Sequence, residues 1–442
     1  MTDYRELSFW HDSVPDDLTP RAGLPGDLDA DVAIVGGGLT GLWTAWYLLE
    51  RDPSLRIVIL EKEIAGFGAS GRNGGWCSAL FPRSTASLER THGRDAALSM
   101  RRAMIDTVDE VGRVAASLGL DIDYAKGGTL ALARTPVQLR AAEAEVAEAA
   151  AYGVDPLELR GAASFDPNCA RVHPAKLVRG LARAVEAAGA TIYEGTEVLD
   201  YRPHEVTTAL GTVRANHVVI ATEGYGATLR ATRRRVLPLY SLMIATEPLT
   251  DAAWQEIGVE HGQTFTDYRH LLVYGQRTAD NRVAFGGRGA RYHWGSTIRP
   301  EYDRVPAVFD HLRRTLGELF PVLGDVAVTH TWGGPLGVPR DWHATASFDR
   351  AKGMAWAGGY VGDGLSTTNL AGRTLADLMT GTDSELTGLP WANHRSPSWE
   401  PEPLRFLGAN AGLAAMTVAD AEEKLTKRPS LAARLMGPLT GH

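Results

Sequence analysis

Two short apolar runs between residues 31 and 60 flank a segment with helical spacing of apolar residues. Residues 31–35 (Asp-Val-Ala-Ile-Val) are rich in β-branched side chains and predict a buried strand. Residues 39–50 carry apolar side chains at helical spacing, and residues 56–60 form a second β-rich run. The order strand, helix, strand predicts a βαβ unit and therefore a parallel sheet.

Helical and strand patterns recur along the rest of the chain. Apolar and charged positions at helical spacing predict further helices at residues 94–118, 136–152, 175–188, 305–319, 368–379 and about 405–425. Short β-rich runs predict strands at residues 191–194, 197–201, 212–214, 217–221, 273–274, 282–286 and 354–357. The runs between 273 and 286 predict antiparallel strands in a second region. Prolines before residue 31 predict an irregular lead-in segment outside the sheet.

Composition narrows the class of protein. The 442 residues, 44% apolar and 22% charged, are typical of a globular enzyme with two closely packed domains. A net charge of -8 argues against a nucleic-acid partner, and we interpret Arg233–Arg235 as a solvated edge. Two widely separated cysteines predict neither a disulfide framework nor a metal site. Without a secretory signal or an apolar run of roughly 20 residues, we expect a cytoplasmic protein with no membrane span.

The first motif that carries chemistry is Gly36-x-Gly38-x-x-Gly41, between the first strand and its helix. Gly36 suits a tight turn, Gly38 lets the backbone approach a pyrophosphate, and Gly41 permits close packing of helix on strand. The N-terminus of the helix favours negative charge. Glu61 ends the next strand, where a carboxylate accepts hydrogen bonds from ribose hydroxyls and repels a phosphorylated ribose. The alternative, a glycine-rich turn without a ligand, is disfavoured by the complete unit.

The second motif is Gly68-Ala-Ser-Gly-Arg-Asn-Gly-Gly75. Here the sequence resembles the D-amino-acid-oxidase-like (DAO) superfamily of FAD-dependent oxidoreductases, most closely the gamma-glutamylputrescine oxidoreductase and glycine oxidase branch. The resemblance implies that Ser70 and Arg72 contact the FAD phosphates and that Asn73 to Gly75 pass the isoalloxazine ring. Consecutive glycines and a guanidinium are suited to both tasks. A mobile surface loop is the alternative.

Two later stretches follow the family pattern. The resemblance implies that Val198 supplies backbone contacts to adenine and that Thr222, at the end of a strand, lies near the pyrophosphate. Residues 358–367 (Gly-Gly-Tyr-Val-Gly-Asp-Gly-Leu-Ser-Thr) are implied to form a second flavin loop, which stabilises negative charge on the flavin. Relatives often carry a histidine where Asp363 stands, so the electrostatics of this loop differ from the family pattern.

The predicted substrate site departs from the family pattern. Amino-acid oxidases of the superfamily usually present an arginine near the stretch 332–339, where this chain has Leu336. This moves the expected substrate from a simple α-amino acid towards an amine, although Arg288 or Arg340 would serve as a carboxylate clamp. Trp332 and Tyr274, with Tyr268 and Tyr292, are candidates to wall the pocket, and the core is their alternative place.

The predicted cofactor-binding residues are Gly36, Gly38, Leu39, Thr40, Gly41, Glu61, Lys62, Gly68, Ala69, Ser70, Arg72, Asn73, Gly74, Gly75, Val198, Thr222, Gly359, Gly362, Asp363, Gly364, Leu365, Ser366 and Thr367. The absence of a suitably placed cysteine or histidine predicts non-covalent FAD, and we interpret Cys77 as an inert buried thiol.

The resemblance implies an α/β (α+β) fold: a discontinuous Rossmann-type FAD-binding domain and a substrate domain built on an antiparallel sheet. The expected boundaries are a lead-in at 1–30, the FAD-binding domain at 31–93, 165–235 and 330–382, the substrate domain at 94–164 and 236–329, and a helical tail at 383–442.

The implied activity is hydride transfer from the carbon beside an amine nitrogen to flavin N5, with hydrolysis of the imine and reoxidation by O2 to H2O2. A dehydrogenase with another acceptor, a monooxygenase, a nicotinamide-linked reductase and a flavoprotein that only binds remain alternatives. No second nucleotide fingerprint supports the reductase.

Overall fold

The first βαβ unit forms where its sequence pattern predicts in the computed structural model, which describes residues 3–434. β1 (Leu28–Val35) leads into α2 (Leu39–Arg51) and β2 (Ile57–Leu60). β1 pairs with β2 in parallel, and both strands are buried at their carboxyl ends. The loop between β1 and α2 therefore lies at the carboxyl edge of a parallel sheet, where α/β proteins bind ligands.

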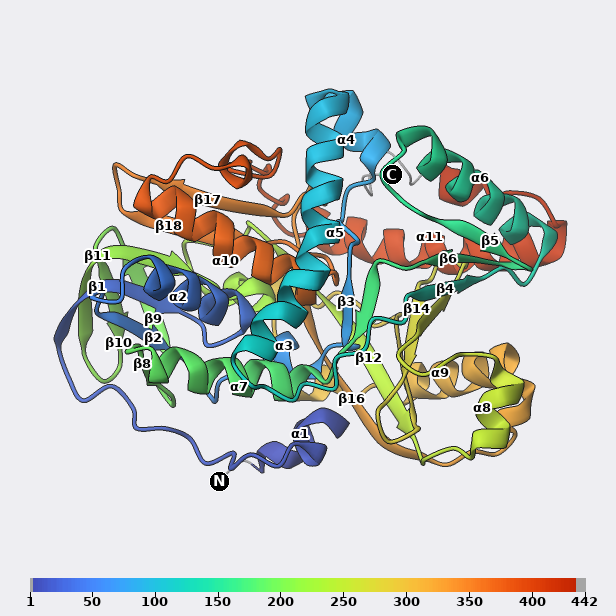
Figure 1. Ribbon diagram of the computed structural model, residues 1–442, viewed down its shortest axis with the longest axis horizontal. Helices are drawn as coiled ribbons and strands as arrows, with labels where there is room; N and C mark the ends of the chain where they lie inside the picture. Colours follow the sequence, from blue (N-terminus) through green and yellow to red (C-terminus); the bar gives the residue numbers. More distant parts are fainter. Residues whose placement is uncertain (1–2, 435–442) are drawn as a thin grey trace.

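The first sheet has eight strands, with the main order β17-β18-β11-β1-β2-β8. Its remaining strands are β8 (Thr191–Tyr193), β9 (Val198–Arg202), β10 (Glu205–Thr208), β11 (Thr212–Ile220), β17 (Thr345–Asp349) and β18 (Met354–Gly358). The sequence predicted β11 as two strands, whereas the backbone continues through Asn216. α2, α7 (Pro174–Ala187) and α10 (Gly364–Thr380) pack beside this sheet (Figure 1).

The second sheet also has eight strands, in the order β16-β12-β15-β14-β13-β4-β6-β5. Its strands are β4 (Thr129–Leu132), β5 (Glu158–Arg160), β6 (Ala163–Asp166), β12 (Leu237–Thr246), β13 (Thr264–Asp267), β14 (Val273–Arg277), β15 (Val283–Arg288) and β16 (Val328–Val338). All neighbours are antiparallel except β4 and β13. α8 (Asp251–Ile257) and α9 (Pro306–Leu319) lie beside it in Figure 1.

Two elements lie on the other side of the expected domain boundaries. β16 pairs along its length with β12, so it belongs to the antiparallel sheet and not to the FAD-binding domain predicted for 330–382. α5 (Arg94–Ser117) packs against α10 and contributes Met104 and Val108 to the core of the first layer, whereas the sequence assigned it to the substrate domain. The positions of both elements depend on the apolar side chains that they bury. Their local sequences do not indicate which sheet they join or pack against.

The lead-in segment is more ordered than its prolines predict. α1 (Phe9–Ser13) buries Phe9 and Trp10 against α3 (Ala69–Arg72) and α7. The Trp10 Nε1 donates to the backbone oxygen of Asn73 at 2.8 Å. The segment therefore supports the second glycine motif directly, which corrects the prediction of an irregular lead.

The remaining elements complete the chain. They are β3 (Trp76–Ser78), β7 (Cys169–Arg171), α4 (Thr85–His92), α6 (Pro136–Tyr152), α11 (Leu404–Thr426), and 3-10 helices at Tyr4–Leu7, Glu223–Thr228, Trp294–Ser296, Pro300–Asp303, Pro321–Leu323 and Glu385–Gly388. β3 and β7 pair and bring Cys77 and Cys169 to neighbouring positions as free, buried thiols. Burial raises the pKa of the Cys169 thiol to about 12, so at neutral pH it holds its proton and is a poor nucleophile.

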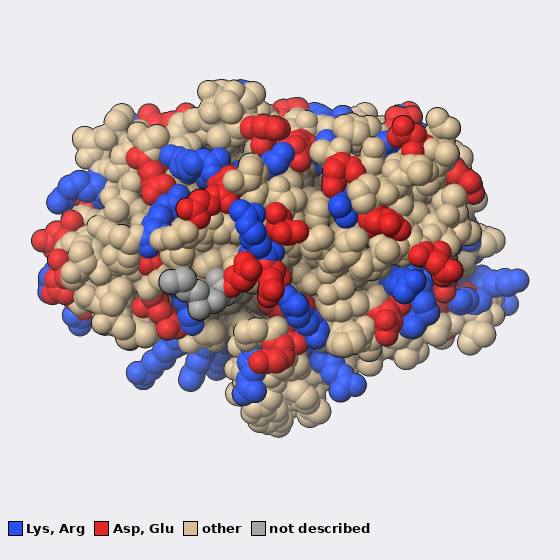
Figure 2. Space-filling model, turned by 90° about the horizontal axis from the view of Figure 1, so that it is seen from below, with Lys and Arg blue, Asp and Glu red and all other residues tan. Residues whose placement is uncertain are grey.

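The predicted tail helix packs on the body. The carboxylate of Asp420 in α11 accepts hydrogen bonds from the backbone of His270 and Leu271, and Asn410 binds the backbone of Tyr292. Residues 435–442 of the expected tail lie outside the described residues. Within residues 3–434, no helix is long and apolar enough to cross a bilayer. Acidic and basic side chains are interspersed on the face seen in Figure 2.

Candidate active site

The turn between β1 and α2 accepts only glycine at two of its positions. Gly36 has φ +109°, and a Cβ there would lie 2.6 Å from the Ala221 carbonyl oxygen. A Cβ at Gly41 would lie 2.2 Å from the Gly36 oxygen. These distances are shorter than any real Cβ contact, so the glycines permit the close packing of helix, turn and strand that a dinucleotide-binding turn requires.

The carboxylate of Glu61 is held at the edge of this turn. Its Oε2 accepts from the Gly37 N–H at 2.8 Å and its Oε1 from the Glu63 N–H at 2.9 Å. Burial raises the pKa of Glu61 to about 7. The Glu61 carbonyl accepts from Thr196 N, which brings the start of β9 and Val198 beside it. Lys62 instead forms an exposed ion pair with Glu197.

Polar groups from three segments meet at the N-terminus of α2. The helix has Gly38 at its N-cap and no side-chain cap of its own, but Leu39 N donates to Ser70 Oγ at 2.8 Å. The backbone N of Thr222 lies 3.6 Å from the point where a Cβ at Gly36 would stand, and its Oγ1 is buried without a partner in residues 3–434. Hydroxyls and amides at a helix N-terminus are the groups that hold a pyrophosphate. Ser70 and Thr222 therefore lie where the sequence expects a phosphate.

The second glycine motif packs against protein in a way the sequence did not predict. Residues 69–72 form the short helix α3, and Asn73 caps it by donating to Ala69 O and accepting from Gly75 N. A Cβ at Gly74 would lie 2.5 Å from the Tyr274 ring, and one at Gly75 would lie 2.1 Å from Gln276 Nε2. The two glycines therefore admit side chains of β14, a close approach that the sequence assigned to the flavin ring.

Arg72 has partners other than the predicted phosphates. Its guanidinium is buried, and it donates to Asp303 Oδ2 at 2.7 Å, to the Gly333 carbonyl at 2.8 Å and to the Tyr225 hydroxyl at 2.8 Å. Burial raises the pKa of Asp303, and the charge of Arg72 opposes that rise. We correct the phosphate assignment, because these bonds tie the FAD-binding layer to β16 and to the residues that precede α9.

The loop after β18 is bound by a buried carboxylate, Glu223, whose role the sequence did not predict. Glu223 accepts hydrogen bonds from Gly359 N at 2.8 Å, Gly337 N at 3.2 Å and Tyr360 N at 3.3 Å. Burial raises the pKa of Glu223 to about 7, although these amides stabilise its charge. Val361 has φ +56°, which is strained for a β-branched residue and is found mainly at functional sites.

The N-terminus of α10 also lacks a side-chain cap. Asp363 stands at the N-cap position, but its carboxylate makes no capping hydrogen bond to the helix. Burial raises its pKa to about 6, and the nearby positive charge of Arg288 opposes that rise. The helix therefore offers the amides of residues 364–367 to a ligand, as the sequence predicts for the second flavin loop.

Arg288 reaches this loop from the second sheet. Its Nη2 donates to the Val361 carbonyl at 2.7 Å, and its guanidinium lies 5.4 Å from the ring centroid of Trp342. Arg288 Nη2 and Leu336 Cδ1 lie 3.8 and 3.7 Å from the point where a Cβ at Gly362 would stand. Arg288 makes no ion pair within residues 3–434. Burial of the guanidinium lowers its pKa. A cationic group and an apolar group thus meet at the loop.

Tyr274 accompanies Arg288. Its hydroxyl shares a hydrogen bond of 2.7 Å with Ser241 Oγ, and Ser241 stands opposite Arg288 in the pairing of β12 with β15. Of the six predicted substrate residues, the structure therefore brings Arg288 and Tyr274 together beside the second loop.

The other predicted pocket residues have different places. Trp332 is 1% exposed, packs in the core and donates its Nε1 to Arg72 O. Arg340 pairs with Glu400 and lies over the Trp399 ring. The Tyr268 hydroxyl binds Ser164 and Glu145, and the Tyr292 hydroxyl binds Glu402. These contacts lie in the core, with β6 and α6, and with the C-terminal segment, so the structure places all four outside the predicted pocket.

The arrangement fits FAD. Two uncapped helix N-termini, the orphaned Thr222 hydroxyl, the Glu61 carboxylate and glycines that leave no room for a Cβ face the carboxyl edge of the first sheet. No cluster of three or more metal-ligating side chains occurs in residues 3–434.

The sequence of residues 31–378 matches the family described as FAD dependent oxidoreductase (DAO). Among curated relatives, gamma-glutamylputrescine oxidoreductase of Escherichia coli is 30% identical over 86% of this chain and 90% of its own length. The probable oxidoreductase OrdL of Haemophilus influenzae is 30% identical over 81% of this chain and 84% of its own.

The fold matches that of solved structures. Glycine oxidase from Geobacillus kaustophilus superposes with a TM-score of 0.70 at 23% identity, over 84% of this chain and 99% of the enzyme. Iminodiacetate oxidase from Chelativorans superposes with a TM-score of 0.63 at 19% identity. These similarities confirm the predicted α/β fold.

Proposed function

Because the chain belongs to the family of FAD-dependent oxidoreductases and is of the amine and amino-acid oxidase type, we propose that it oxidises a C–N bond in an amine that also carries a carboxylate. The observation that carries this proposal is Arg288, a guanidinium beside the second glycine loop with no carboxylate partner in residues 3–434. Guanidinium groups bind carboxylates through paired, charge-assisted hydrogen bonds.

The residues that would hold FAD lie along the carboxyl edge of the first sheet. Gly36 to Gly41, Ser70 and Thr222 would receive the pyrophosphate, Glu61 and Val198 the adenosine half, and the N-terminus of α10 the flavin end. When bound there, FAD would supply the two-electron oxidant, a hydride acceptor for the carbon beside the amine, and water would hydrolyse the released imine.

The side chains of the site position the substrate. Arg288 would bind the carboxylate and thereby orient the amine towards the flavin end, while Leu336 and Tyr274 form an apolar wall that excludes water. Asp363 places a second charge beside Arg288 and sets how strongly the guanidinium attracts an anion. No side-chain base is needed if the amine arrives unprotonated. We further propose that O2 reoxidises the flavin.

Anaerobic flavin bleaching tests this function. Purified, FAD-loaded protein is mixed with a panel of amines, N-methyl amino acids and gamma-glutamylated polyamines, and the flavin absorbance near 450 nm is followed. We expect amines with a carboxylate to bleach the flavin faster than their decarboxylated analogues.

Readmitting air then tests the acceptor, because an oxidase regains its colour and releases H2O2. Bleaching by NADPH but by no amine would establish the reductase instead. Slow recovery in air with fast recovery on adding a quinone would establish a dehydrogenase.

A further inference from the structure

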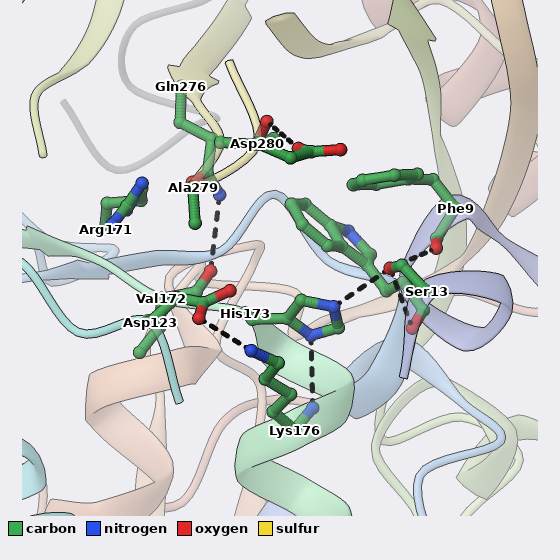
Figure 3. Close-up of a pocket in the computed structure, with 12 residues that line it drawn as sticks. Phe9, Ser13, Asp123, Arg171, Val172, His173, Lys176, Gln276, Ala279 and Asp280 are labelled. Atoms are coloured by element: carbon green, nitrogen blue, oxygen red, sulfur yellow. Dashed lines mark hydrogen bonds and ion pairs between the residues drawn. The ribbon is translucent and has the colours of Figure 1, made fainter. Parts of the chain in front are cut away.

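A pocket of about 360 Å³ lies apart from the flavin loops, between α1, the N-terminus of α7 and the turn that joins β14 to β15 (Figure 3). None of residues 36–41 or 359–367 lines it. Its wall includes Gln276, which reaches the other side of the Gly74 backbone by donating to Gly74 O at 2.6 Å. The pocket is therefore a neighbour of the active site and has a different lining.

An unpaired cation lines this pocket. Arg171 is 3% exposed and donates one hydrogen bond, from Nη1 to the Arg277 carbonyl at 3.3 Å. Its Nε is buried without a partner, and no carboxylate of residues 3–434 lies within ion-pair distance of the guanidinium. Burying a charge without a counterion is costly, so a bound anion would stabilise this arrangement.

The other charged groups of the pocket are already paired. Lys176 Nζ lies 2.7 Å from Asp123 Oδ1, and Asp280 Oδ2 accepts from Arg282 Nε at 2.7 Å. Arg171 is therefore the charged side chain of the lining that has no ion-pair partner among residues 3–434.

His173 adds no charge. Its Nδ1 accepts from the Lys176 N–H at 3.1 Å, and its Nε2 lies 3.0 Å from Ser13 Oγ (Figure 3). Burial lowers the pKa of His173 to about 4, which keeps the ring neutral at neutral pH.

One side of the pocket is aromatic. Phe9 and Trp10 of α1 line the pocket and are 4% and 1% exposed, and Phe9 lies across the pocket from Ala279 (Figure 3). We propose that this pocket binds a small organic monocarboxylate, with the carboxylate on Arg171 and the apolar body against Phe9 and Trp10. One positive charge beside aromatic rings favours this ligand over the more highly charged and fully polar phosphate.

Calorimetric titration with benzoate tests the site in the FAD-loaded protein. The titration uses the Arg288→Met variant as its base, so that the clamp proposed beside the flavin cannot bind the probe. We expect saturable binding at one site per chain. Adding Arg171→Met is expected to raise the Kd about tenfold or more, because a charge-assisted hydrogen bond is lost. Arg214→Met removes an equal charge from an exposed arginine of β11 and should leave the Kd unchanged.

A second variant guards against a folding defect in Arg171→Met. Ala279 is exposed on the turn, so Ala279→Glu should preserve the melting temperature while its carboxylate repels the ligand and raises the Kd similarly. The proposal is overturned if benzoate does not bind saturably, if both pocket variants keep the Kd of the base protein, or if inorganic phosphate binds more tightly than benzoate.

Discussion

We expect binding of FAD to depend on single glycines at the turn between β1 and α2. We predict that Gly41→Ala gives a colourless protein, because the new Cβ would lie 2.2 Å from the Gly36 oxygen and would push α2 away from the turn. The ratio of absorbance near 450 nm to that at 280 nm after purification with added FAD measures this. Gly317→Ala in α9 is the matched control, since nothing lies within 4 Å of its Cβ; it should keep the colour and gain up to about 1 kcal/mol.

Arg288 is the residue on which substrate choice depends. Arg288→Met should lower kcat/KM for carboxylate-bearing amines by about tenfold to a hundredfold, because charge-assisted hydrogen bonds worth about 1.5–3 kcal/mol are lost. Steady-state rates on an amine pair that differs only in the carboxylate measure it, and the decarboxylated partner should be unaffected. Arg340→Met, at the ion pair with Glu400, serves as control. An equal loss on both amines would refute the clamp.

Asp363 should make carboxylate binding depend on pH. Its pKa is raised from 3.8 to about 6, so the native state holds the proton more tightly than the unfolded state between those values. As pH rises through this window, Asp363 therefore lowers the free energy of unfolding, and its charge also comes to oppose the attraction between Arg288 and a substrate carboxylate.

We predict that Asp363→Asn lowers KM for a carboxylate substrate above about pH 6 and has little effect below it. The ratio of wild-type to variant KM across pH measures this, since protonation of the amine affects both proteins alike. A ratio that stays constant with pH would contradict the prediction.

The sequence could predict the roles of residues that depend on neighbours close in the chain. Gly36, Gly41 and Glu61 lie within one βαβ unit, so their spacing alone indicates their tasks. Trp332 donates a hydrogen bond to the backbone oxygen of Arg72, which lies 260 positions earlier in the sequence, and no nearby residue indicates that contact.

Between elements, Glu223 is the residue that joins β11 to β16 and β18. Glu223→Ala should lower the free energy of unfolding by about 2–4 kcal/mol, because three buried amides lose their acceptor. Denaturant unfolding measures this, with Glu256→Ala on the exposed face of α8 as control. A loss no larger than that of the control would show that water replaces the carboxylate.

Strands were harder to predict than helices for a physical reason. β12 is a central strand that contains Pro238, a residue that cannot donate to a ladder and usually marks an edge. β16 carries Gly333, Gly334 and Pro335, which resemble a loop in sequence. Both become strands because long-range pairing offsets their weak local preference. The helices at 94–117 and 136–152 are set by their own apolar spacing, and both were predicted within a residue.

At the scale of the whole molecule, the ion pair of Arg72 with Asp303 joins the two layers. Arg72→Met should cost about 3–5 kcal/mol of unfolding free energy, because it leaves the Asp303 carboxylate buried without a counterion. The double variant Arg72→Met, Asp303→Leu should recover part of this loss, since neither charge then remains. Denaturant unfolding of the single and double variants measures the coupling, and strictly additive losses would show that the pair contributes none.

The domain boundaries were the least predictable feature at this scale. α5 begins the segment 94–164 that the sequence assigned to the substrate domain, yet its buried side chains pack with α10. The segment 94–164 is therefore divided between the two layers, because α5 packs with α10 while β4 and β6 pair in the second sheet.

The ion pair between Arg72 and Asp303 can form only late in the synthesis of the chain. Arg72 leaves the ribosome 231 residues before Asp303 and 261 before Gly333. Until then the loop that follows β2 lacks this ion pair, and the second flavin loop at residues 358–367 has not yet been synthesised. Secure capture of the cofactor is therefore a late event, and ribosomes stalled before residue 303 should carry chains that exchange FAD freely.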